Sequence, residues 1–133
     1  MTSYHFRWLV FMLAANYYLY EAPVNKLIIK YLVHKKMKIY LLSQNVVNGY
    51  DTYDSAIVVA ENEDEARKIH PNEYVTHVTN EQWMGTYSGG GEYKNEPEDW
   101  VKYSDIDKIS VKYIGEASKE QQKGLVLASF NAG

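Results

Sequence analysis

Planar polar and aromatic side chains gather at two places in the sequence. The first is Gln44 and Asn45 together with residues 50–54, which include Tyr50 and Tyr53, and the second is 128–133, with Phe130 and Asn131. A nucleobase or nicotinamide ring is bound by stacking on aromatic side chains and by hydrogen bonds from amides. These residue types therefore predict a site for a small ligand that contains a ring.

Arg67 is the only arginine after residue 36. A guanidinium group is a planar fork that matches two phosphate oxygens at once, so Arg67 is a candidate phosphate anchor. The alternative is an ordinary ion pair with Glu63, four residues earlier on an expected helix. The sequence leaves both interpretations open.

Catalytic chemistry has one candidate pair, Asp51 and Asp54, although aspartates at the entrance to a strand more often form turns. His70 and His77 stand seven residues apart across a proline, which is no metal-ligand spacing. The glycines at 89–91 lack the Lys-Ser/Thr of a phosphate loop, and the chain has neither a cysteine nor a serine-nucleophile elbow. We therefore expect binding without conversion, with no catalytic residues, no metal site and no cofactor.

The charge of the chain changes sign at Met37. Residues 1–36 have five Lys or Arg against one Glu, a net charge of +4, whereas 37–133 have nine against sixteen, a net charge of −7. The overall fractions, 46% hydrophobic and 23% charged residues, are those of a globular protein. An acidic domain argues against binding a nucleic-acid polymer, which needs many cations.

Residues 1–36 form a basic, hydrophobic N-terminal extension that we expect to be helical. Its thirteen-residue uncharged run, 8–20, is too short to span a bilayer, which takes about 20 residues. Four interpretations stay open: a secretion signal, a short hydrophobic anchor, a helix that docks on a partner, and an over-extended gene start. The change of composition at Met37 favours the last.

Residues 37–133 read as a ligand-binding α+β domain: a small antiparallel sheet of four to five strands packed with one main helix. A helix capped by Asn62 should end at Pro71. A loop at 81–97, expected to be long and mobile, would bring Trp83 and Tyr87 over the ligand. Strands are expected at 38–44, 53–60, 74–79, 109–116 and 124–130, with a short one at 100–103 and a single turn at 104–108.

Five segments resemble small phage and prophage proteins of the Thoeris anti-defence family, which are sponges for cyclic ADP-ribose. They are IYLLSQN at 39–45, YDTYDS at 50–55, AENEDEARKIHP at 60–71, YIGEA at 113–117 and ASFNAG at 128–133. The resemblance covers 37–133 and none of 1–36. It implies a protein of the host bacterial cytoplasm that sequesters cyclic ADP-ribose isomers made by TIR-domain enzymes, without cleaving them.

The resemblance also implies a homo-oligomer with ligand pockets between protomers, and in some members a separate site for cyclic oligonucleotides. It assigns residues by type and place: stacking to Trp83, Trp100 and Phe130, polar contacts to Gln44, Asn45 and Asn131, and phosphate binding to Arg67. Two alternatives remain. One is a protein-interaction module with a tyrosine-rich surface, and the other is a small nucleotide hydrolase that uses Asp51 and Asp54.

Overall fold

The computed structural model describes residues 36–133, which form one unit, Lys36–Gly133. The expected helical extension lies outside the described residues except for Lys36, so its four interpretations stay predictions. In the described part of the chain, no helix combines the length and the apolar character needed to cross a membrane.

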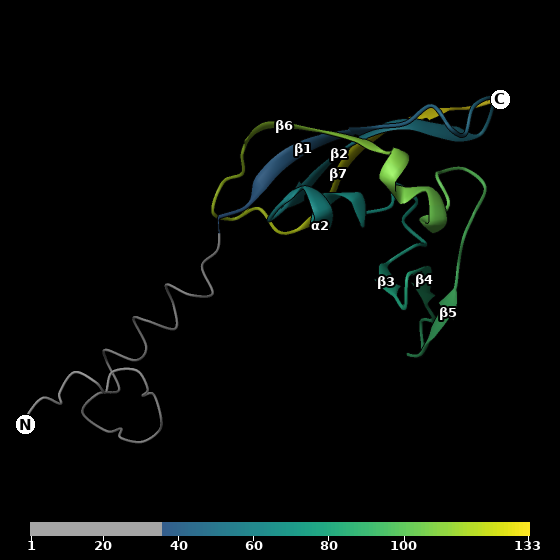
Figure 1. Ribbon diagram of the computed structural model, residues 1–133. Helices are drawn as coiled ribbons and strands as arrows, with labels where there is room; N and C mark the ends of the chain where they lie inside the picture. The colour runs from purple at the N-terminus through teal and green to yellow at the C-terminus, as the bar shows by residue number, and fades with distance from the viewer. Residues whose placement is uncertain (1–35) are drawn as a thin grey trace, which may run out of the picture. The chain divides into compact units, whose positions relative to one another are not determined.

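The larger layer is a four-stranded antiparallel sheet with strand order β6-β1-β2-β7 (Figure 1). Its strands are β1 Lys38–Ser43, β2 Thr52–Ala60, β6 Ser110–Glu116 and β7 Gly124–Asn131. β1 and β2 pair from Lys38 opposite Ala60 to Ser43 opposite Ser55. The four apolar runs that predicted these strands are confirmed within one or two residues at each end.

A second sheet, with order β3-β4-β5, begins in the strand expected at 74–79, which is shorter than expected, and continues through the region expected to be a long mobile loop. Its strands are β3 His77–Thr79, β4 Gln82–Thr86 and β5 Glu92–Lys94. The loop expectation for 81–97 is therefore wrong. The three glycines form the turn of the β4–β5 hairpin, with Gly90 and Gly91 at φ of 98° and 83°, a backbone conformation that favours glycine.

Two short helices complete the described fold (Figure 1). α2, Glu63–Arg67, is capped as expected, because the Asn62 side chain accepts a hydrogen bond from the Glu65 amide at 2.9 Å. It ends earlier than Pro71 and packs against β1, β2 and β6. A 3-10 helix, η3, spans Tyr103–Lys108, and no strand forms at 100–103. The result is a small, mainly-β α+β fold with two sheets instead of one.

The core that joins the layers is built around two tryptophans and a histidine. Trp83 and Trp100 are 1% and 0% exposed, and the Trp83 indole donates a hydrogen bond to the Val101 carbonyl at 3.0 Å. The His70 ring meets Trp83 edge-on, with ring centroids 4.9 Å apart, and lies 6.3 Å from Trp100. His70 Nδ1 accepts a hydrogen bond from the Asn72 amide, and burial lowers the pKa of His70 to about 3.

The buried histidine makes stability depend on pH. Its folded-state pKa of about 3 lies below the ordinary value of 6.5, so between these pH values the unfolded chain binds the extra proton. The contribution of His70 is complete above pH 6.5 and is lost as the pH falls. We expect the free energy of unfolding to drop by roughly 1 kcal/mol per pH unit between pH 6 and 5.

Urea denaturation at several pH values checks this. His70→Gln should lose the pH dependence in that interval, whatever its absolute stability, whereas His77→Gln, at a more exposed histidine on β3, should keep it. An unchanged slope in His70→Gln would contradict the assignment.

Candidate functional site

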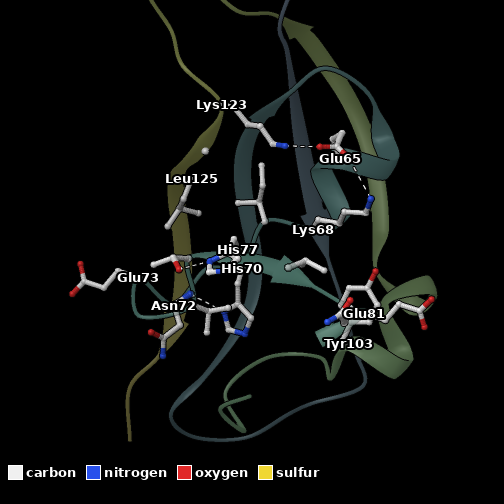
Figure 2. Close-up of a pocket in the computed structure, with 16 residues that line it drawn as sticks. Glu65, Lys68, His70, Asn72, Glu73, His77, Glu81, Tyr103, Lys123 and Leu125 are labelled. Atoms are coloured by element: carbon white, nitrogen blue, oxygen red, sulfur yellow. Dashed lines mark hydrogen bonds and ion pairs between the residues drawn. The ribbon is translucent and has the colours of Figure 1, made fainter. Parts of the chain in front are cut away.

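A cavity of about 900 Å³ lies between α2, β3 and the start of β7 (Figure 2). Its walls come from the end of α2, the segment that leads to β3, the β3–β4 turn, Tyr103 of η3 and the first residues of β7. We call it the α2–β7 pocket. Its volume is in the range usual for sites that take small organic ligands.

Two lysines and one glutamate form one end of the α2–β7 pocket. Glu65 accepts hydrogen bonds from Lys123 at 2.5 Å and from Lys68 at 3.3 Å, which links α2 to the segment before β7 (Figure 2). The hydrogen bond from Lys123 is the main cause that lowers the pKa of Glu65. Since Glu65 already neutralises part of this charge, an anionic ligand would compete with it for the two ammonium groups.

The opposite part of the pocket wall is held rigid by Asn72. Its amide Nδ2 donates to Asp99 Oδ2 at 2.7 Å, its Oδ1 accepts from the Tyr74 amide at 2.9 Å, and its backbone amide donates to His70 Nδ1 at 3.0 Å. Because Nδ1 accepts, the proton of the neutral His70 ring is on Nε2. The wall is therefore organised before any ligand arrives.

Several of the residues that the sequence singled out meet at a different place, the end of the large sheet where β2 begins and β7 ends (Figure 1). The rings of Tyr53 and Phe130 are tilted against each other with centroids 4.8 Å apart. The Asp51 amide donates to the Asn131 carbonyl at 2.5 Å. The two sequence clusters, 44–54 and 128–133, are thus brought together, and Phe130 remains 46% exposed.

The other polar residues at this end of the sheet mainly support the β1–β2 connection. The Gln44 side chain accepts from the amides of Val46 and Val47 and donates to the carbonyls of Val47 and Tyr53, at 2.6 to 2.8 Å. Its amide is fully used by these bonds. Asn45 is exposed and accepts a hydrogen bond through its carbonyl from the turn, while Tyr50 is 80% exposed and free to meet a ligand.

A cavity of about 590 Å³ beside this cluster is acidic. Asp51, Glu98 and Asp99 are among its lining residues, together with Tyr50, and no lysine or arginine of residues 36–133 lines it. Three carboxylates repel a phosphate at short range. The α2–β7 pocket, which has Lys68 and Lys123, is electrostatically the better site for an anionic ligand.

Three further predicted ligand residues, Trp83, Trp100 and Arg67, also line neither cavity. Trp83 and Trp100 are core residues, and their burial disagrees with the stacking role expected of them because neither ring has a free face. Arg67 is half-buried, donates from Nε to the Ile109 carbonyl at 3.3 Å and has its Nη1 atom 3.6 Å from Asp64. This guanidinium anchors α2 to the start of β6, and its expected helix partner Glu63 is replaced by Asp64.

Asp51 and Asp54 are placed as turn and strand residues. Asp51 has a φ of 59° and accepts a hydrogen bond from the Gly133 amide, whereas Asp54 accepts one from the adjacent Ser55 hydroxyl at 3.1 Å. Neither lines the α2–β7 pocket. Among residues 36–133, no group of three or more His, Asp or Glu side chains is placed to hold a metal ion.

Sequence reasoning missed the side chains of the α2–β7 pocket because they come from separate, short elements. Lys68, Asn72, Tyr103 and Lys123 belong to no common motif. The only local signals beside them are Gly124 and Pro71, which indicate where neighbouring elements begin or end.

Comparison of the chain with protein-family models, with curated proteins and with solved structures gave no match.

Proposed function

We propose that this protein binds and sequesters a cyclic ADP-ribose-type signalling nucleotide in the α2–β7 pocket, without cleaving it, in the host bacterial cytoplasm. The observation that carries the proposal is the pocket of about 900 Å³ with two lysines at one end and a tyrosine ring at another part of its wall. A nucleotide needs both features, a cationic region for its phosphates and a planar face for its ring.

The division of roles follows from where the side chains lie. Lys68 and Lys123 would contact the diphosphate, because ammonium groups bind phosphate as point charges. Tyr103, half-buried and packed against Trp83 with ring centroids 5.5 Å apart, would offer its ring to the base. The fixed polar wall around Asn72 would supply directional hydrogen bonds.

The state of His70 argues against its use as a general base in the pocket, which His77 also lines. A general base works best with a pKa near the working pH, and burial holds the pKa of His70 at about 3. His70 would thus accept protons poorly at neutral pH. The carboxylates of the hydrolase alternative, Asp51 and Asp54, would have to act from outside this pocket.

Recovery of the ligand tests the proposal. The full chain should bind a cyclic ADP-ribose isomer and, when heated, release it chemically unchanged; at about 100 times its Kd the ligand should stabilise the fold by roughly 2.7 kcal/mol. ADP-ribose or another cleavage product in the supernatant would favour the hydrolase instead. Absence of any thermal shift with cyclic ADP-ribose isomers would contradict the proposed binding.

Charge-removing variants test the placement of the phosphates. Lys68→Gln and Lys123→Gln should each raise the Kd about tenfold, because each removes a charge-assisted hydrogen bond to the ligand. Lys108→Gln is a matched control, since Lys108 makes a similar ion pair with Asp105 at 3.1 Å but does not line the pocket. Isothermal titration calorimetry gives the three values. Equal effects of all three changes would argue against this site.

The edge strands support the further expectation of a homo-oligomer. β7 pairs with β2 on one side only within the described sheet, and it has no charged residue or proline. Its Leu127 and Val126 are 63% and 51% exposed. Edge strands are usually protected by charges, as β6 is by Lys112 and Glu116. We therefore place the contact between copies of the chain at the β7 edge.

A lysine introduced on each edge strand in turn tests which of the two strands forms the contact between copies. Leu127→Lys should dissociate the assembly of the full chain, and Ile114→Lys, on the β6 edge at a side chain that is 46% exposed, should leave it intact. Light scattering after size exclusion gives the mass of each. Equal masses for the two variants would contradict an interface at the β7 edge.

A further inference from the structure

The turn between β3 and β4 has an unusual residue at a strained position. Thr79 pairs with Gln82, so the hairpin loop consists of Asn80 and Glu81, with φ of 53° and 58°. A two-residue hairpin loop with both φ values positive is the geometry that favours Asn-Gly. Asn80 fits this preference, whereas Glu81 occupies the place of the glycine at a cost in stability.

Nothing within residues 36–133 offsets that cost. The Glu81 side chain is exposed, and its carboxylate makes no hydrogen bond or ion pair in this part of the chain. A residue in a strained conformation that makes no stabilising contact is a candidate for function. Its position agrees with this, because Glu81, like Tyr103, lines the α2–β7 pocket (Figure 2).

The charges of the pocket restrict what Glu81 can recognise. A carboxylate accepts hydrogen bonds and repels phosphate, so its partners on a nucleotide are donor groups such as the ribose hydroxyls. Figure 2 shows Lys68 and Lys123 gathered around Glu65, away from Glu81 and Tyr103. Phosphate and sugar can therefore occupy different parts of the same pocket.

We propose that Glu81 is a specificity-determining residue that accepts hydrogen bonds from the ribose hydroxyls of the ligand. The inference rests on the proposed function. Carboxylates at the ends of secondary-structure elements recognise ribose hydroxyls in dinucleotide-binding folds by the same chemistry. Glu81 in place of glycine thus lowers the stability of the turn, and it provides selection of a ribose-containing ligand over a deoxyribose one.

The test uses the full chain with three substitutions. Glu81→Gly should raise the thermal midpoint, because glycine suits a φ of 58°, and should weaken binding of a cyclic ADP-ribose isomer at least about tenfold. Glu81→Gln keeps the size of the side chain and should weaken binding similarly. Glu120→Gln, at an exposed glutamate that does not line the pocket, is the matched control and should leave the Kd unchanged.

A 2′-deoxy ligand distinguishes recognition of ribose from a purely structural role of Glu81. A structural role would not change the preference between the two ligands. The unaltered chain should prefer the cyclic ADP-ribose isomer over its 2′-deoxy analogue, and Glu81→Gln should lose most of that preference. Full affinity in Glu81→Gly, or an unchanged preference in Glu81→Gln, overturns the role of Glu81 alone. Failure of the unaltered chain to bind either nucleotide overturns the proposed function and this inference with it.

Discussion

The packing of Trp83 is the contact on which the rest of the structure depends. β4 belongs to a three-stranded sheet whose outer strands have only three residues each, and so small a sheet buries too little surface to be stable alone. Trp83 attaches it to the rest of the domain, since its buried side chain belongs to the same core cluster as residues of the large sheet and its indole donates to the Val101 carbonyl. An aromatic ring of this size contributes more buried area than any other side chain in the small sheet.

His70 shows what this packing requires of its neighbours. A polar ring between two indoles must stay neutral, and the Asn72 amide satisfies one of its nitrogens. The same Asn72 is tied to Asp99, beside Trp100. The α2–β7 pocket is therefore bounded by groups whose positions are already determined by the core, which reduces the ordering needed when a ligand binds.

Much of the fold was predictable, because β1, β2, β6 and β7 are longer runs of β-branched and apolar residues between turn signals. The cap at Asn62 was also readable from its side chain and the acidic turn after it. The second sheet was not. β5 is Glu-Tyr-Lys and β4 contains Gly85, and strands so short and polar gain stability from tertiary packing rather than from intrinsic propensity. The glycine run, expected to belong to a long mobile loop, forms the turn between β4 and β5.

Sequence reasoning about the site named two clusters of residues, and strand pairing in the large sheet brings members of the two clusters together. Tyr53 and Phe130 do meet, since β2 and β7 pair. Trp83 and Trp100 were expected to stack on a ligand. Aromatic residues are equally typical of cores and of binding pockets, and only their burial in the structure distinguishes the two. The pocket itself is assembled from the ends of α2, β3, η3 and β7, a juxtaposition that no local pattern specifies.

An NMR titration of the full chain with a cyclic ADP-ribose isomer tests the central claim most directly. Binding in the α2–β7 pocket should give saturable shifts of the amide and side-chain signals of Asn72, Tyr103 and Lys123, with little change at Tyr50 and Asn131. Shifts confined to Tyr50, Phe130 and Asn131, or no saturable shift at all, would contradict it.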